Sequence, residues 1–276
     1  MTLARCRLAG FFFAALICAP LAGQTAAGSP QLSREEQERF LLDAQIVNSE
    51  RLSQGITGSQ RATLSDGRIT HDAHIQSIDE FTPRKKTDRG LEVNFRDSYK
   101  FNIAAYRLDK LLGLNMVPVS VERKVGQNMA AVTWWVDDVL MQEKDRFLKG
   151  IDPPDIDAWN RQMYQARVFN QLVANTDPNL GNFLITKSWK LWTIDFTRGF
   201  RTHKDLLDRK QLTCIDPRFH EALKTLNEES IKHEVGSLLS DWELAGLLAR
   251  REKVVEFFDR KATEQGPAQA FCATRP

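Results

Sequence analysis

The spacing of apolar residues predicts helices in three parts of the chain. In residues 33–53, Ser33 and Glu36 have the spacing of a capping box, and apolar residues follow three or four positions apart. Residues 96–114 and 155–176 show the same period, which places their apolar side chains on one helix face. Apolar residues continue at helical spacing through most of the remaining sequence. The C-terminal half is therefore expected to be mostly helical.

Alternating apolar and polar residues predict strands between these helices. A hairpin is indicated around Asp66 and Gly67, because this pair favours a tight turn between two alternating runs. Residues 80–90 (EFTPRKKTDRG) carry many charges and are expected to form a solvated loop. The predicted strands are 61–64, 68–78, one on each side of the turn at 126–128, 183–185 and 191–194.

The order of these elements predicts an α+β fold with two lobes. A small strand-rich part with one main helix comes first, and a mostly helical part with a strand pair follows. The joint falls near 136–139, and a cleft between lobes is the usual place for a ligand. The expected divisions are a signal peptide at 1–27, an N-terminal helical extension at 28–50, an N-lobe at 51–138, a C-lobe at 139–265 and a tail at 266–276.

Composition narrows the classes of partner. The chain has 276 residues, of which 42% are apolar, so a sizeable core is expected and global disorder is not. The formal net charge is only +2, from 38 basic and 36 acidic side chains. This balance gives no reason to expect nucleic acid as a partner.

The N-terminus has the layout of a secretory signal. Arg5 and Arg7 precede an apolar run, and small residues follow, with cleavage expected after Ala22 or Ala27. An uncleaved anchor is the alternative, although the run is short for a membrane span. We expect an exported protein, periplasmic or secreted, with no stable membrane span once the signal is cleaved.

Export would change both the number of cysteines in the mature protein and their redox environment. Cleavage would remove Cys6 and Cys18 and leave Cys214 and Cys272. In an oxidising compartment the remaining two could pair and tie the C-terminal tail to the body of the protein. Two unpaired thiols are equally consistent with the sequence.

Oxygen-bearing side chains recur in the segment 175–201. Asn182 follows Asp177 by five residues, and Asp195 comes after the predicted strand pair. In phosphoryl transfer, an Asp accepts the proton of the acceptor hydroxyl, an Asn five residues on holds Mg²⁺, and a second Asp binds the metal that bridges the phosphates. Mg²⁺ needs oxygen ligands, which these residues supply. The alternative is that Asp195 pairs with Arg198, or Asp177 with Arg201, as a structural ion pair.

Two longer segments resemble a known family. The run NIAAYRLDKLLGLNMVPVSVER (102–123) is similar to the helix-and-strand block of a protein-kinase-like group that includes the HipA toxins, the secretory-pathway Fam20 kinases and the phosphatidylinositol kinases. The runs FNQLVANTDPNLGNFLI (169–185) and WKLWTIDFTRGF (189–200) resemble its catalytic and metal loops. The resemblance covers about residues 50 to 250. It implies a bilobal kinase-like fold, ATP or another nucleotide in the cleft, and Mg²⁺ or Mn²⁺ as cofactor.

The resemblance also implies roles for single residues. Asp177 matches the catalytic base, and Asn182 and Asp195 match the metal ligands. A second group matches the glycine-rich loop that would cover the nucleotide phosphates. Its residues are Gly55, Gly58 and Ser59.

Two positions depart from the pattern of an active kinase. The helix position of the ion-pairing Glu is occupied by Asn102, and the strand position of the phosphate-binding Lys by Gln76. An active kinase normally needs this Lys–Glu pair. Two functions follow as hypotheses: an exported phosphotransferase acting on a hydroxyl-bearing acceptor, or a catalytically inactive, pseudokinase-like binding module.

Overall fold

A computed structural model describes residues 32–52, 59–87 and 90–272, and the fold lies in the unit that begins at Ser33. The predicted signal peptide, 1–27, and the glycines Gly55 and Gly58 lie outside the described residues.

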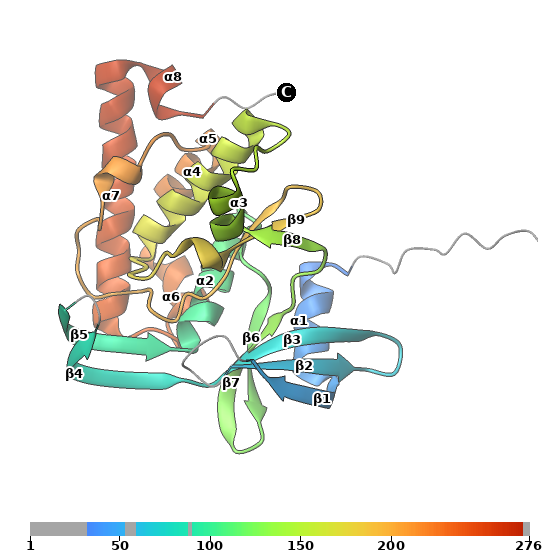
Figure 1. The fold of residues 1–276 in the computed structure, drawn as a ribbon. Coiled ribbons are helices and arrows are strands. Elements are labelled where there is room, and N and C mark those ends of the chain that lie inside the picture. Colours follow the sequence, from blue (N-terminus) through green and yellow to red (C-terminus); the bar gives the residue numbers. More distant parts are fainter. Residues whose placement is uncertain (1–31, 53–58, 88–89, 273–276) are drawn as a thin grey trace, which may run out of the picture. The chain divides into compact units, whose positions relative to one another are not determined.

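A five-stranded antiparallel sheet forms the N-terminal part of this unit (Figure 1). The hairpin predicted around Asp66 and Gly67 is confirmed, and Gly67 takes the positive φ of 84° that such a turn requires. The second hairpin, on either side of the 126–128 turn, is confirmed as well. In spatial order the strands are β1 (Gln45–Arg51), β2 (Gln60–Ser65), β3 (Thr70–Gln76), β7 (Asn128–Trp134) and β6 (Ser120–Val125).

Strand β1 replaces the second half of the predicted N-terminal helix. The capping box of Ser33 and Glu36 is present, but helix α1 ends at Asp43. Beyond Ala44 the backbone is extended, and β1 pairs with β2 as an edge strand. Pairing satisfies the backbone groups of this segment and suits its β-branched Ile46 and Val47, which outweighs the helical spacing.

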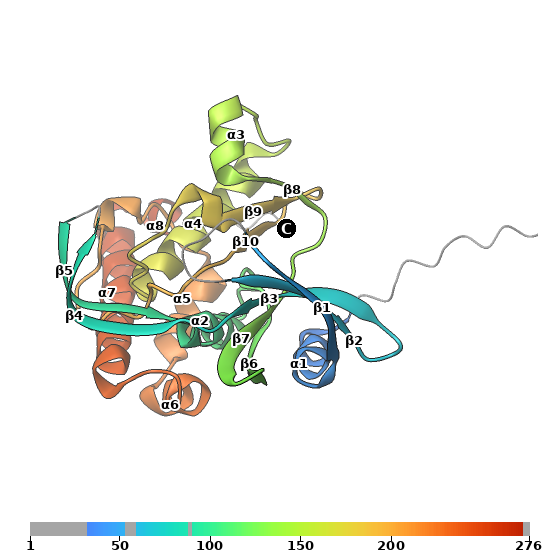
Figure 2. The ribbon, with the colours of Figure 1, turned by 60° about the horizontal axis from the view of Figure 1, so that its bottom comes forward.

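The predicted loop at 80–90 is instead part of a two-stranded ribbon. Strands β4 (Asp79–Thr87) and β5 (Gly90–Ser98) pair antiparallel and form a sheet of their own. Both faces of such a ribbon can meet solvent, so it carries charges that are otherwise typical of a loop. Figures 1 and 2 show the ribbon extending towards one end of α7 (Asp241–Gln265), where Arg96 approaches Glu243 at 4.0 Å.

Helix α2 (Lys100–Leu111) packs on the five-stranded sheet and ends as predicted at Gly113, which has φ +68°. The buried Asp109 carboxylate accepts hydrogen bonds from the backbone N–H groups of Met116 (2.9 Å) and Val117 (3.2 Å), and from Arg34 (2.8 Å). Asp109, which belongs to the kinase-like run 102–123, therefore holds the turn between α2 and β6.

The C-terminal part combines a small sheet with helices, as predicted. The five-stranded sheet ends at Trp134 and the next sheet begins at Val139, on either side of the predicted joint. That sheet contains β8 (Val139–Gln142), β9 (Phe183–Thr186) and β10 (Leu191–Thr193). The helices are α3 (Glu143–Lys149), α4 (Ile156–Leu172), α5 (Pro217–Thr225), α6 (Glu228–Val235), α7 and α8 (Pro267–Ala270), with 3₁₀ turns at Leu180–Asn182 and Arg209–Gln211. None of the described helices is long and apolar enough to cross a membrane.

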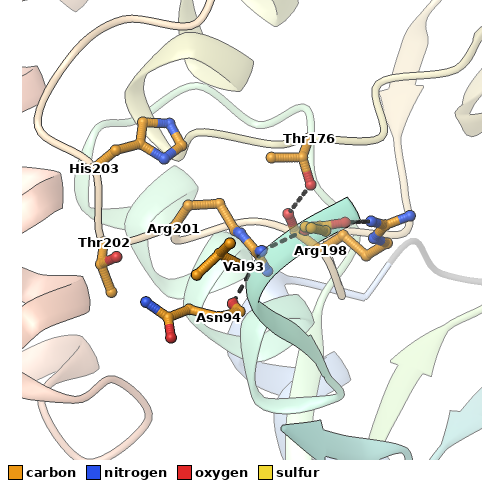
Figure 3. A pocket seen from close by; sticks show the side chains of 8 residues that line it. Val93, Asn94, Thr176, Arg198, Arg201, Thr202 and His203 are labelled. Atoms are coloured by element: carbon orange, nitrogen blue, oxygen red, sulfur yellow. Dashed lines mark hydrogen bonds and ion pairs between the residues drawn. The ribbon is translucent and has the colours of Figure 1, made fainter. Parts of the chain in front are cut away.

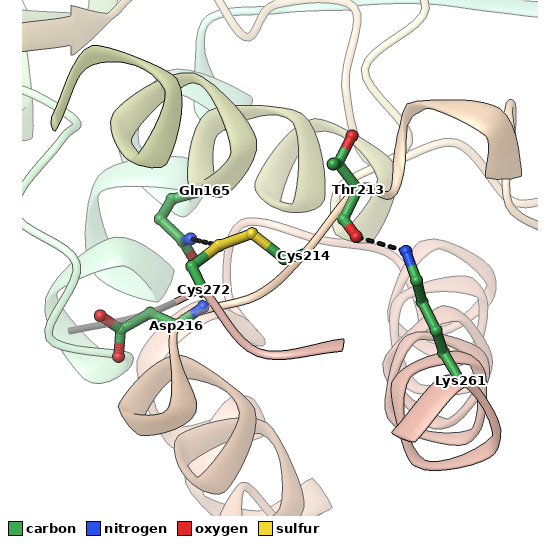
Figure 4. Close-up of a disulfide and its surroundings, with 6 residues drawn as sticks. All are labelled: Gln165, Thr213, Cys214, Asp216, Lys261 and Cys272. Atoms are coloured by element: carbon green, nitrogen blue, oxygen red, sulfur yellow. Dashed lines mark hydrogen bonds between the residues drawn. A yellow bond between two sulfur atoms is a disulfide. The ribbon is translucent and has the colours of Figure 1, made fainter. Parts of the chain in front are cut away.

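Cys214 and Cys272 form a disulfide, which decides between the two alternatives left open by the sequence. Figure 4 shows the bond beside α4, where the Gln165 side chain contacts the Cys272 sulfur at 3.7 Å. Next to it, Ile215 and Phe271 form a parallel β-bridge. Phe271 and Cys272, directly after α8, are therefore fixed to the body of the C-terminal part.

Candidate active site

Two loops of the C-terminal part run side by side and carry the predicted site residues. One loop follows α4 (173–182), and the other follows β10 (194–200). Backbone hydrogen bonds join them along their length: Phe200 N to Val173 O (2.5 Å), Thr176 N to Arg198 O (3.2 Å) and Ile194 N to Asn182 O (2.9 Å). Asp177 and Asp195 both lie within the paired stretch, so the fold brings residues 18 positions apart to one place.

The asparagines of the first loop give it its shape. Asn175 accepts a hydrogen bond from the backbone N–H of Asp177 (3.0 Å), and Asn179 accepts one from Gly181 (2.9 Å). The Asn182 amide nitrogen donates to the carbonyl of Asp177 at 3.4 Å. With its nitrogen engaged in this contact, the Asn182 amide keeps its oxygen as the atom suited to a metal ion.

Asp195 has a strained backbone and a perturbed carboxylate. Its φ is +59°, a left-handed conformation that a non-glycine residue seldom adopts outside constrained sites. The side chain opens to solvent but is otherwise surrounded by protein, and this desolvation raises its pKa. The nearby Asp177 carboxylate raises the pKa further, while a hydrogen bond from the Thr197 hydroxyl (3.1 Å) opposes the shift.

Asp97 is a further carboxylate at this place that the sequence did not indicate. It lies near the end of β5, where Ser98 N donates to Thr197 O at 2.9 Å. Burial raises the pKa of Asp97, and the Asp195 carboxylate adds to that shift. The buried Oδ1 of Asp97 accepts no hydrogen bond from any residue that the structure describes. A buried oxygen without a donor is costly unless a proton or a cation compensates it.

These oxygens fit a divalent cation shared with a ligand. Within the described ranges, no group of three or more His, Cys, Asp or Glu side chains is arranged to hold a metal ion alone. A metal bridging nucleotide phosphates needs fewer protein ligands, because phosphate oxygens complete its coordination. Asp195 and Asn182 carry oxygen atoms of the type that such a metal needs. The Asp97 oxygen without a donor lies close enough to Asp195 for the two charges to interact.

The two departures from the kinase pattern contact each other. The Asn102 amide nitrogen donates to Gln76 Oε1 at 2.8 Å, and both side chains are buried. Asn102 Oδ1 accepts from the backbone N–H of Phe196 at 2.7 Å. A neutral bridge therefore links β3, α2 and the loop that carries Asp195.

Solved structures with similar folds include hydra Fam20 with sugar, which has a TM-score of 0.63 and 13% identity over 86% of this chain and 91% of that chain. The Golgi casein kinase, also solved with Mn/ADP bound, has a TM-score of 0.61 and 11% identity over 86% of this chain and 78% of that chain. The fold is protein-kinase-like. No protein-family model and no curated relative matches the sequence.

Asn102 lies on α2 and Gln76 on β3, a helix and a strand as the sequence predicted. That they stand at the positions of the ion-pairing Glu and the phosphate-binding Lys stays a prediction. The predicted glycine-rich loop falls between β1 and β2. Of its three residues only Ser59 is described: it is buried, and its carbonyl accepts from Leu52 N at 2.9 Å. A role for Ser59 in nucleotide binding stays a prediction.

The structural ion pairs offered as an alternative are not what the two arginines form. Arg198 and Arg201 both bind the carboxylate of Glu92, on β5. No local pattern predicts this contact, because residues more than a hundred positions apart make it.

Proposed function

We propose that the chain is a phosphotransferase that moves a phosphoryl group from a nucleotide, ATP in the simplest case, to a hydroxyl-bearing acceptor. The observation that supports it most is the pairing of the 173–182 and 194–200 loops, which gathers Asp177, Asn182 and Asp195. This is the set of groups that phosphoryl transfer requires, on a fold that supports it.

In the proposed reaction, Asp177 accepts the proton of the acceptor hydroxyl as its oxygen bonds to phosphorus. The bond from phosphorus to the leaving nucleoside diphosphate breaks, and that product keeps the electron pair. Asn182 and Asp195, with Asp97 beside them, would hold Mg²⁺ or Mn²⁺. A bound cation supplies charge neutralisation at the phosphates. The Thr197 hydroxyl keeps the Asp195 carboxylate oriented.

The proposed location is outside the cytoplasm, periplasmic or secreted. The signal layout of residues 1–27 motivates this proposal. The Cys214–Cys272 disulfide supports it, because such bonds persist mainly in oxidising compartments.

A second function, a pseudokinase-like binding module, is favoured by the Gln76–Asn102 bridge alone. Without the Lys of an active kinase, the phosphates lose one orienting charge. Such a module would bind a nucleotide or a partner in the cleft without transferring phosphate.

Phosphate transfer by the mature protein tests the proposal. The chain from residue 28 is incubated with γ-labelled ATP, Mg²⁺ or Mn²⁺, and a panel of protein, lipid, glycan and small-molecule hydroxyl acceptors. We expect label on an acceptor or on the protein itself, lost in Asp177→Asn and kept in Asp241→Asn, a matched change at an exposed position of α7. Nucleotide binding without transfer to any acceptor would favour the binding module.

A further inference from the structure

A cavity of about 400 Å³ lies beside the candidate active site (Figure 3). One wall comes from β5 and includes Glu92 and Val93, and the other comes from the loop after Asp195 and includes Arg198 and Arg201. Thr176, the residue before the proposed base, also lines it. The cavity is therefore next to the place where an acceptor hydroxyl would meet Asp177.

The charges lining this cavity are unbalanced. Both guanidinium groups bind the single carboxylate of Glu92. Arg201 also donates to the carbonyls of Arg96 (3.0 Å) and Asn94 (3.1 Å), and burial lowers its pKa. The buried Nε of Arg198 has no hydrogen-bond partner in the part of the chain that the structure describes. The carboxylates of Glu243 and Asp97 also act on Arg201, but they do not line the cavity. On the cavity side the two arginines face the Glu92 carboxylate, which a stronger anion can replace.

The basic wall is held rigidly from behind. Arg250 of α7 is fully buried and donates to the carbonyls of Leu172 (2.9 Å), Arg201 (2.8 Å) and His203. Gly246, one turn earlier, lets α7 approach closely, because a Cβ there would lie 2.8 Å from the Arg201 carbonyl oxygen. The backbone of Arg201 is thus held by a helix of the C-terminal core, and the carbonyl of Arg198 is held by Thr176.

The acidic group is a single flexible side chain. Glu92 belongs to the β4–β5 ribbon, which is tied to the body of the protein further along β5, where Arg201 binds the carbonyls of Asn94 and Arg96. The half-buried Glu92 side chain can therefore turn away while the ribbon stays in place. Moving Glu92 away would leave two fixed, desolvated arginines facing the cavity.

We propose that this cavity binds an anionic group of the acceptor, a carboxylate or a phosphate, which replaces the Glu92 carboxylate on Arg198 and Arg201. This proposal rests on the proposed phosphotransferase function and narrows its substrate class to acceptors that carry an anion near the reacting hydroxyl. In the free protein, Glu92 occupies the site as an internal competitor. The exposed Val93 side chain offers an apolar contact beside the anion.

Binding of inorganic phosphate, measured by calorimetry without nucleotide or metal, tests the cavity directly. Glu92→Gln keeps hydrogen bonds to the arginines but removes the competing charge, so phosphate should bind about tenfold more tightly, the order of one charge-assisted hydrogen bond. Arg198→Gln should weaken phosphate binding by a similar factor. Glu80→Gln removes a carboxylate that binds Lys85 on the same ribbon, and should leave the affinity unchanged.

Acetate titrated in parallel shows whether the cavity prefers a phosphate or a carboxylate. Tighter binding of either ion to Glu92→Gln than to the unaltered protein supports the proposal. Equal phosphate affinity in Glu92→Gln, Arg198→Gln and the unaltered protein would overturn it, even if transfer activity is found. The converse result, phosphate affinity that follows these variants in a protein without transfer activity, would keep the anion site and reject the phosphotransferase. Asp177→Asn should not change phosphate affinity, because the anion contacts Arg198 and Arg201.

Discussion

The two halves of the candidate site differ in charge, although one protein-kinase-like fold carries both. In the C-terminal half, Asp177, Asn182 and Asp195 lie on two paired loops, and desolvation and mutual repulsion raise the pKa of Asp195. In the N-terminal half, Gln76 and Asn102 bind each other through neutral amides. The proposed metal-binding half therefore carries charges, whereas the half with Gln76 and Asn102 is neutral.

The comparison indicates that the bridge between β3 and α2 has a structural role of its own. A buried ion pair must repay a large desolvation cost, and an amide pair avoids that cost. The bond from Phe196 N to Asn102 still fixes the loop that carries Asp195.

The largest expected effect is on chemistry in the metal-binding half. Asp177→Asn removes the proposed base and should lower phosphate transfer by roughly 10²–10⁴-fold, the usual contribution of general base catalysis. Metal-dependent nucleotide binding should stay near that of the unaltered protein, because Asn182 and Asp195 are intact. Labelled-phosphate transfer and calorimetry measure the two quantities. Transfer that survives the change would remove Asp177 from the mechanism.

Loss of the disulfide should lower the stability of the whole protein without changing either half of the candidate site. It therefore serves as a reference for the variants within the site. Replacing Cys214 and Cys272 by Ser opens a loop with a sequence separation of 58. The chain-entropy model predicts a loss of about 4 kcal/mol in the free energy of unfolding. Urea denaturation measures the loss, and nucleotide affinity under native conditions should not change. A changed affinity would mean that the disulfide also shapes the cleft.

Breaking the neutral bridge should cost somewhat less stability. Asn102→Leu leaves Phe196 N and the Gln76 side chain without their present partner, and should lower the free energy of unfolding by roughly 2–4 kcal/mol. Asn102→Asp keeps an acceptor for Phe196 N, and should recover part of this loss. Urea denaturation of both variants is the measurement. A loss under about 1 kcal/mol for Asn102→Leu would show that the bridge is not structural.

Much of the fold was predictable because its signals are local. The capping box at Ser33, the Asp66–Gly67 turn and the helix stop at Gly113 each specify structure within a few residues. The errors arose where tertiary pairing overrode local pattern. Strand β1 carries a helical spacing but finds an edge to pair with, and the β4–β5 ribbon has the composition of a loop.

The site residues divide in the same way, into those that local spacing indicated and those that tertiary contacts bring to the site. The spacing of Asp177, Asn182 and Asp195 was readable because two short loops carry all three. Asp97 was not, because it reaches the site from a ribbon whose strands were not predicted. The contact between Glu92 and the arginines was hidden for the same reason.

A smaller effect concerns pH and the N-terminal half. Burial lowers the pKa of His74, on β3 two residues before Gln76, from 6.5 to about 4. The unfolded chain binds a proton below pH 6.5 and the folded chain does not, so stability should fall as the pH drops from about 6.5 towards 4. By pH 5 the loss should be about 1–2 kcal/mol. His74→Leu should remove this part of the pH dependence in urea denaturation, and an unchanged profile would contradict the assignment.

Thermal denaturation with nucleotide and metal tests the central claim most directly. ATP with Mn²⁺ should raise the melting temperature of the unaltered protein. At a nucleotide concentration a hundredfold above Kd, the free energy of unfolding should rise by about 2.7 kcal/mol. Nucleotide or Mn²⁺ alone should have less effect, and Asp195→Ala should abolish the joint effect. A shift that is absent from the unaltered protein, or that persists in Asp195→Ala, would contradict a metal-nucleotide site built on these loops.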